Sequence, residues 1–188
     1  MTSDEPAALL RTITAALEAA AIPYMIVGSF ASTAYGKPRT THDLDIVIDP
    51  TAAGLDQFLD AVDPDRFYVD ADVARDALRR RTMFNLIDMN TAWKIDLVIR
   101  KNRPFSVQEL ARRVVMPIAS VEVATATAED TIIAKLEWAK LGASERQLID
   151  VAGILHVGSA ALDFDYIERW VEALDLGEQW RCARALTT

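Results

Sequence analysis

Three aspartates and a Gly-Ser pair are the residues of this chain with the clearest capacity for chemistry. Gly28-Ser29 follows a short apolar run, Asp43 and Asp45 open a second run, and Asp96 lies within a third. A carboxylate in a buried strand is costly unless it is paired or binds a cation. Because hard divalent cations prefer oxygen ligands, the three acids predict a metal site beside a turn that can receive phosphate groups.

The Gly-Ser pair lies between a predicted strand at residues 22–27 and a segment, residues 30–35, that can start a helix. Glycine permits a tight turn and a close approach of backbone. The N-terminus of a helix offers free N–H groups to an anion. Strand, turn and helix together therefore suit terminal phosphates, although such a turn taken alone is more typical of a connection without a ligand.

The second run, residues 43–50, predicts a strand in which Asp43 and Asp45 point to one face. Leu44, Ile46 and Ile48 then point to the other face, into a core. Two carboxylates side by side repel each other, and a cation between them removes the conflict. The alternative is that both acids lie in water at the frayed start of the strand.

The third run, residues 92–99, is strand-like and follows another strand-like run at residues 83–89, so the two predict a hairpin. Asp96 shares its face with Lys94. It is expected either to lie beside Asp43 and Asp45 on an adjacent strand or to form an ion pair with Lys94.

The ordered set of Gly-Ser, Asp-x-Asp and a later Asp resembles the nucleotidyltransferase superfamily, which includes DNA polymerase beta and the aminoglycoside nucleotidyltransferases. Within it, the chain looks most like the AbiEii-type group of type IV toxin–antitoxin and phage-defence systems. That group carries a further Asp-x-x-x-x-Lys motif, matched here by Asp130 and Lys135. The resemblance covers roughly residues 20–155.

This resemblance implies an α+β fold, a nucleotidyltransferase-like mixed sheet flanked by helices, with a C-terminal helical bundle. It implies transfer of a nucleoside monophosphate from an NTP, with two Mg²⁺ ions. The metal ligands and catalytic acids would be Asp43, Asp45 and Asp96. The nucleotide would contact Gly28, Ser29, Asp130 and Lys135, with Arg146 and Asp150 bordering its site and Arg39, four residues before Asp43, close enough to meet the triphosphate.

Several of these residues also have ordinary structural explanations. Thr127 with an acid three residues later is a capping pattern, so Asp130 can be a cap-region acid at a helix start. Lys135 can extend its amine to solvent from beside an apolar stripe. Arg146 and Asp150, four residues apart, can be a surface ion pair.

The remaining pattern is predominantly helical outside the strands. Helices are predicted at residues 6–21, 51–62 and 72–81, then a short one ending near 112. Strands are predicted at 114–115 and 118–124, and helices at 127–142, 144–157 and through 164–186. The expected organisation is a nucleotidyltransferase core at residues 1–125 and a C-terminal helical subdomain at residues 126–188.

Composition narrows the class of protein. The chain has 188 residues, a net charge of −8 and a single cysteine, Cys182, which rules out an internal disulfide. No apolar stretch approaches the roughly 20 residues that span a bilayer. No signal peptide is visible, and a cytoplasmic protein without a membrane partner is expected.

Charge is unevenly distributed. Residues 75–113 hold ten of the twenty Lys and Arg but four of the twenty-eight acids. This segment predicts local contact with a phosphate backbone, so RNA is the expected acceptor, and a solvated face is the alternative. The resemblance to the AbiEii-type group implies that the RNA is tRNA above all, that the protein is a toxin-like component, and that a cognate antitoxin is a partner. Two other functions stay open: a catalytically silent nucleotide- or partner-binding member, and a small-molecule nucleotidyltransferase of the antibiotic-modifying kind.

Overall fold

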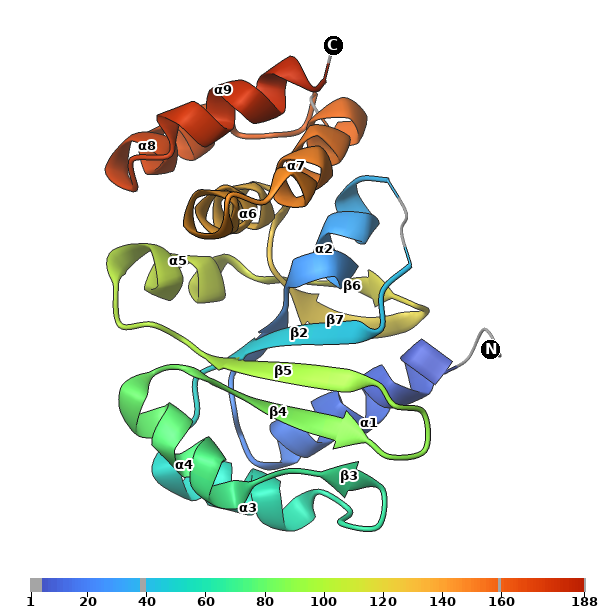
Figure 1. Ribbon diagram of the computed structural model, residues 1–188. Helices are drawn as coiled ribbons and strands as arrows, with labels where there is room; N and C mark the ends of the chain where they lie inside the picture. The colour runs from blue at the N-terminus through green and yellow to red at the C-terminus, as the bar shows by residue number, and fades with distance from the viewer. Residues whose placement is uncertain (1–4, 38–39, 159, 188) are drawn as a thin grey trace.

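A computed structural model describes residues 5–37, 40–158 and 160–187 of the chain. It shows a mixed seven-stranded sheet with helices on its faces and a stack of four further helices at the C-terminal end (Figure 1). The predicted α+β class, with a mixed sheet flanked by helices and further helices at the C-terminal end, is confirmed.

The sheet has the strand order β3-β4-β5-β2-β1-β7-β6. Its strands are β1 Tyr24–Ile26, β2 Asp43–Ile48, β3 Phe67–Tyr68, β4 Met83–Asp88, β5 Lys94–Ile99, β6 Val114–Ile118 and β7 Val121–Thr125. The pairs β2–β5 and β1–β7 are parallel, and the other neighbours are antiparallel. The predicted hairpin of residues 83–99 is therefore present as β4–β5.

Two details of the sheet differ from the sequence prediction. Strand β3 is only two residues long, which is too short to produce a recognisable alternating pattern. The turn between β6 and β7 falls at Ala119 and Ser120, which both adopt positive φ, of 46° and 66°. Ile118 therefore ends β6 and does not begin β7.

One face of the sheet is covered by α1 Glu5–Ala19, α3 Ala52–Ala61 and α4 Ala71–Arg80. Leu44, Ile46 and Ile48 are fully buried against these helices, as the alternation in β2 predicts. Local capping fixes where two of the helices begin. The hydroxyl of Thr51 accepts a hydrogen bond from the Gly54 N–H at the start of α3, and a carboxylate caps α4 in the same way.

The opposite face of the sheet carries α5 Pro104–Arg112, whose Leu110 packs with Met25 and Ala126. Because Val47 packs against this small cluster, the face of β2 that bears Asp45 and Val47 is the face turned toward α5. The acids and the apolar core of β2 thus lie on opposite sides of the sheet.

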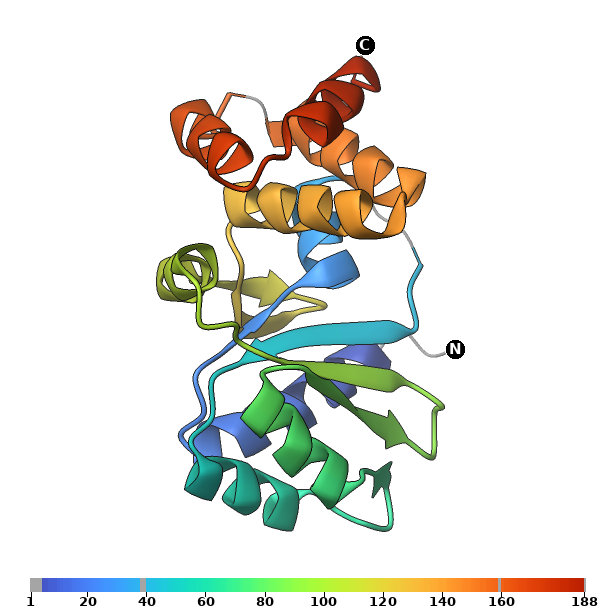
Figure 2. The ribbon, with the colours of Figure 1, turned by 60° about the vertical axis from the view of Figure 1, so that its left-hand side comes forward.

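The C-terminal helices are α6 Ala128–Gly142, α7 Glu145–Gly158, α8 Phe164–Ala173 and α9 Gly177–Ala185 (Figure 2). They enclose a second apolar core that also takes in Phe105 of α5, with Tyr35 packed against it. Helix α2 Gly28–Tyr35 contacts α6 and α7 and also strand β2. It therefore connects the C-terminal helices to the sheet. The division at residue 125 stays a prediction.

None of the described helices is both long enough and apolar enough to cross a membrane.

Candidate active site

The turn at Gly28 brings the start of α2 against strand β2. Gly28 has a φ of +63°, and α2 begins there without a hydrogen bond from the side chain of its capping residue, Val27. The backbone N–H of Ser29 donates a hydrogen bond to the carboxylate of Asp45. The predicted strand, Gly-Ser turn and helix are all present, and a carboxylate occupies the anion-attracting N-terminus of the helix.

The aspartates of β2 and β5 lie side by side. In the parallel pairing of these strands, Asp45 is opposite Asp96 and Asp43 is opposite Lys94. Burial raises the pKa of Asp45, and the charges of Asp96 and Asp43 raise it further, while Lys135 and the Ser29 N–H lower it. The expectation that Asp96 lies beside Asp45 on an adjacent strand is confirmed, and the exposed Asp43 lies two residues away along β2, opposite Lys94.

Asp96 also has the ion pair that was the alternative. Its Oδ2 lies 2.8 Å from Lys94 Nζ, and its Oδ1 accepts a hydrogen bond from the Asn85 amide. The hydrogen bond to Asp96 is the main influence that raises the pKa of Lys94. Both predicted neighbourhoods of Asp96 are thus present at once.

The three carboxylates suit a divalent cation in chemistry and in register. Their mutual repulsion, visible in the pKa of Asp45, is what a cation would relieve. Within the described ranges, however, no group of three or more His, Cys, Asp or Glu side chains is gathered closely enough to hold a metal ion as it stands. The donor set fits Mg²⁺ provided that Asp96 exchanges Lys94 for the cation.

A cleft of about 500 Å³ opens beside this group of acids. Its floor is formed by β2 and β5 and its walls by α5 and α6. Among the residues predicted for the site, four line it: Gly28, Ser29, Asp45 and Lys135. Asp43 and Asp96 do not line the cleft. Asp45 does, so it is where the cleft meets the group of acids.

Lys135 is held inside the fold. Its side chain is 4 % exposed, and Nζ lies 2.7 Å from Asp150 Oδ2 and 3.0 Å from Gln147 Oε1, both on α7. The amine therefore does not extend to solvent. Its charge lowers the pKa of Asp45, so it acts on the end of the cleft that holds Asp45 while α7 anchors it.

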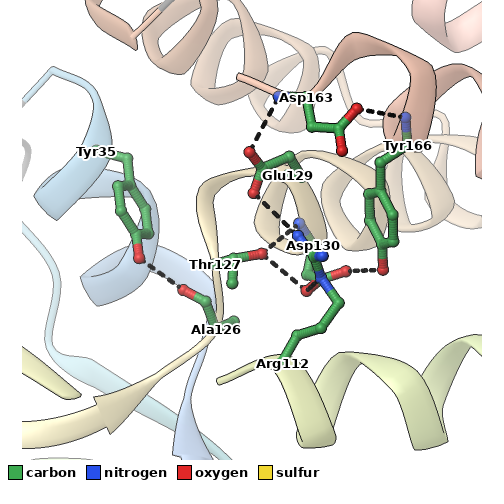
Figure 3. Close-up of polar contacts among 8 residues, drawn as sticks. All are labelled: Tyr35, Arg112, Ala126, Thr127, Glu129, Asp130, Asp163 and Tyr166. Atoms are coloured by element: carbon green, nitrogen blue, oxygen red, sulfur yellow. Dashed lines mark hydrogen bonds and ion pairs between the residues drawn. The ribbon is translucent and has the colours of Figure 1, made fainter. Parts of the chain in front are cut away.

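Asp130 has a different environment, shown in Figure 3. Its carboxylate is fully buried and accepts hydrogen bonds from Tyr166 Oη at 2.5 Å, Thr127 Oγ1 at 2.7 Å and Arg112 Nε at 3.2 Å. Burial, and then the hydrogen bond to Asp130, raise the pKa of Tyr166. This carboxylate ties the start of α6 to α5 and α8 and does not line the cleft, so its contact with a nucleotide stays a prediction.

The sequence predicts two arginines, Arg39 and Arg146, at the nucleotide site. Arg146 is exposed and does not line the cleft, and its predicted neighbour Asp150 bonds Lys135. Arg39 lies outside the described residues. Contact of these arginines with a triphosphate therefore stays a prediction.

The cleft also contains residues that were not among the sequence candidates, and Glu109 and Thr131 are two buried polar ones. Glu109 of α5 lines the cleft although it is 7 % exposed; burial raises its pKa to about 8, the charges of Asp130 and Glu137 add to this, and Arg103 opposes it. Thr131 of α6 also lines the cleft, with a buried hydroxyl that has no hydrogen-bond partner within residues 5–37, 40–158 and 160–187. A signal for Glu109 existed, since it lies four residues after the buried Phe105 and so on the same helix face.

The basic segment is largely neutralised. At least eight of its ten cationic side chains lie within 4.0 Å of a carboxylate oxygen: Arg75, Arg79, Arg80, Arg81, Lys94, Arg100, Arg103 and Arg112. The segment thus has fewer free charges than its composition suggests, and an RNA partner stays a prediction.

Comparison with known proteins identifies the fold. No protein-family model and no curated protein sequence matches the chain. Among solved structures, it is similar to the solution structure of the antibiotic-resistance factor ANT(2'')-Ia, with a TM-score of 0.61, 14 % identity and 93 % of each chain covered. It is also similar to an antigenic nucleotidyltransferase-like protein from Paracoccidioides brasiliensis, with a TM-score of 0.54, 18 % identity and coverage of 92 % of this chain and 91 % of that one. At these identities the likeness shows a nucleotidyltransferase-like fold and says nothing of the AbiEii-type group.

Proposed function

We propose that the chain is a Mg²⁺-dependent nucleotidyltransferase, which transfers a nucleoside monophosphate from an NTP to a hydroxyl group of an acceptor. One observation carries this proposal. The parallel register of β2 and β5 sets Asp45 beside Asp96, at the N-terminus of the helix that begins at Gly28. Carboxylates for cations and backbone N–H groups for phosphates then meet at one end of a cleft.

Each side chain has a role in this proposal. Asp43, Asp45 and Asp96 would hold Mg²⁺, which when bound stabilises the negative charge that builds up on the triphosphate. The backbone at Gly28 and Ser29 binds the terminal phosphates. Lys135, fixed by Asp150, offsets charge on the leaving group.

The reaction balances with one bond formed and one broken. The acceptor oxygen forms a bond to the α-phosphorus, the bond from that phosphorus to the oxygen bridging the β-phosphate breaks, and pyrophosphate leaves. The proton of the acceptor hydroxyl passes to the carboxylate of Asp96. Rate enhancement in such a site comes mainly from positioning and electrostatics.

A small hydroxylated molecule is the acceptor we favour. The cleft of about 500 Å³ is within the range of small-molecule sites, and the arginines that suggested a nucleic acid are mostly paired with acids. RNA is the second candidate, because residues 75–113 still hold half of all Lys and Arg. The AbiEii-type assignment and a cognate antitoxin rest on the motif set alone.

The test is transfer of label from each NTP, labelled at the α-phosphorus, in the presence of Mg²⁺. One acceptor pool is total RNA and the other is a panel of hydroxylated small molecules that includes aminoglycosides. We expect labelled small-molecule product with the native protein and with Asp60→Asn, an exposed control on α3, and none with Asp45→Asn.

The other outcomes separate the alternatives. Label in a discrete RNA band would favour the RNA acceptor. Binding of NTP and Mg²⁺ without transfer to either pool would support a catalytically silent nucleotide-binding member. Transfer that persists in Asp45→Asn would overturn the assignment of the site.

A further inference from the structure

Two buried polar groups of the cleft have no hydrogen-bond partner among the residues that the structure describes. Thr131 is 3 % exposed, and its Oγ1 makes no hydrogen bond to any of those residues. Glu109 is 7 % exposed, and within the described residues its carboxyl group makes no hydrogen bond or ion pair. Buried polar groups are almost always hydrogen-bonded, and an unsatisfied one is destabilising. Both groups line the cleft, which is where a ligand can reach them.

The neighbouring charged groups cannot supply the missing partners, because they are already engaged. Glu137 accepts two hydrogen bonds of 2.6 Å from the Arg103 guanidinium. Asp130 is bonded to Arg112, Tyr166 and Thr127. Glu109 is therefore surrounded by paired acids and basic groups, and its own carboxyl remains open to the cleft.

The positions of Glu109 and Thr131 relate them to the end of the cleft at which the proposed function places the phosphates. Thr131 precedes Lys135 by one helical turn, so both lie on the same side of α6. The charge of Asp130, the residue before Thr131, acts on Glu109 across the gap from α6 to α5. The charge of Lys135 acts on Asp45. In an NTP, the group that follows the phosphates is the sugar.

We propose that Glu109 and Thr131 bind the 2′- and 3′-hydroxyls of the ribose of the NTP, so that the protein selects ribonucleotides over deoxyribonucleotides. This inference rests on the proposed function. A ribose hydroxyl both donates and accepts hydrogen bonds, which matches a threonine hydroxyl and a carboxyl group in either protonation state. Acidic side chains bind ribose hydroxyls in the same manner in dinucleotide-binding folds.

The experiment is calorimetric titration of the full chain, with Mg²⁺, using each ribonucleoside triphosphate and its 2′-deoxy and 3′-deoxy counterparts. We expect the ribonucleotide to bind roughly tenfold more tightly than either deoxy form, as the loss of a hydrogen bond to a buried group implies. In Thr131→Val and Glu109→Met the ratio falls toward one. Thr131→Ser, which keeps the hydroxyl, and Glu168→Gln, an exposed acid on α8, retain the native ratio.

Folding and binding are separable in these variants. Because neither side chain has a hydrogen bond or ion pair to lose in the described part of the chain, Thr131→Val and Glu109→Met should unfold at or above the native midpoint temperature. Equal affinity for ribo and deoxy forms in the native protein, or an unchanged ratio in both variants, would overturn the ribose assignment while leaving nucleotide transfer intact. Failure of every NTP to bind would overturn the proposed function together with this inference.

Discussion

The carboxylate of Asp45 fills the space in which Gly28 would carry a side chain. A Cβ placed at Gly28 would lie 2.0 Å from Asp45 Oδ2 and 2.7 Å from its Cγ. The φ of +63° at Gly28 is also a conformation that L residues rarely adopt. Glycine is therefore required here twice, by the backbone and by the neighbouring acid.

Replacement of this glycine tests that relationship. Gly28→Ala should lower the free energy of unfolding by roughly 2–4 kcal/mol, since left-handed strain and overpacking add. Urea denaturation measures the change. Gly142→Ala is the matched control, because no heavy atom lies within 4 Å of its added methyl group, and it should cost nothing or stabilise by up to about 1 kcal/mol. Equal losses in the two variants would contradict the contact with Asp45.

In the proposed metal site, Lys94 would compete with a cation for Asp96, since the two side chains form an ion pair. In Lys94→Met, the Mg²⁺ concentration for half-maximal NTP binding should fall about two- to fivefold, in keeping with the ~1 kcal/mol of a partly exposed ion pair. A fluorescent NTP analogue titrated with Mg²⁺ gives the value. Lys140→Met removes the same charge from the ion pair with Asp175, in the C-terminal part of the chain. It should leave the Mg²⁺ concentration for half-maximal NTP binding unchanged. A higher Mg²⁺ requirement in Lys94→Met would argue against Asp96 as a ligand.

The buried pair of Lys135 and Asp150 has a measurable effect on stability. Lys135→Met removes the amine that lies 2.7 Å from Asp150 Oδ2, and should destabilise the fold by roughly 3–5 kcal/mol because a buried ion pair loses one of its members. Adding Asp150→Asn in the same chain should recover part of that loss. A double-mutant cycle with no coupling between the two positions would refute the pair.

Asp130 should matter more to folding than to nucleotide affinity. Asp130→Asn weakens the bonds from Tyr166, Thr127 and Arg112, and we expect a loss of about 2–4 kcal/mol in the free energy of unfolding. Tyr166→Phe removes one of these bonds and should cost about 1–2 kcal/mol. Glu172→Gln, exposed on α8, is the control. A fall in NTP affinity without a fall in stability would instead support the predicted nucleotide contact.

Glu109 makes stability depend on pH. Its pKa is about 8 in the fold against an ordinary value of 4.5, so between these values the folded state keeps a proton that the unfolded state has released. The free energy of unfolding should therefore fall as pH rises from about 4.5 to 8, by an amount on the order of a few kcal/mol. Urea denaturation at several pH values should show a smaller fall in the free energy of unfolding for Glu109→Gln than for the native protein. Parallel curves for the two proteins would exclude this role of Glu109.

Sequence reasoning predicted those parts of the site that depend on short-range patterns. The period of two in a strand placed Asp43 and Asp45 on the face opposite Leu44 and Ile46, and this holds. The capping pattern at Thr127 located the start of α6. Such features follow from a few consecutive residues, so the chain itself contains the necessary information.

Partners from distant parts of the chain could not be predicted in this way. Arg103 reads as a free cation in a basic segment, yet it is bonded to Glu137, thirty-four residues later. The sequence left open whether the amine of Lys135 extends to solvent or reaches a triphosphate, and its burial against Asp150 was not foreseen. These pairs depend on how helices pack, which the spacing of residues along one helix does not record.

The hydrogen bond from Ser29 to Asp45 has a further consequence, in thermodynamic linkage. The same N-terminus of α2 that would bind phosphate is already satisfied by a carboxylate, and the same carboxylate would bind the cation. Withdrawal of Asp45 toward a cation frees the N–H for phosphate, and arrival of phosphate releases Asp45 for the cation. If both ligands bind here as proposed, they strengthen each other's binding by an equal factor.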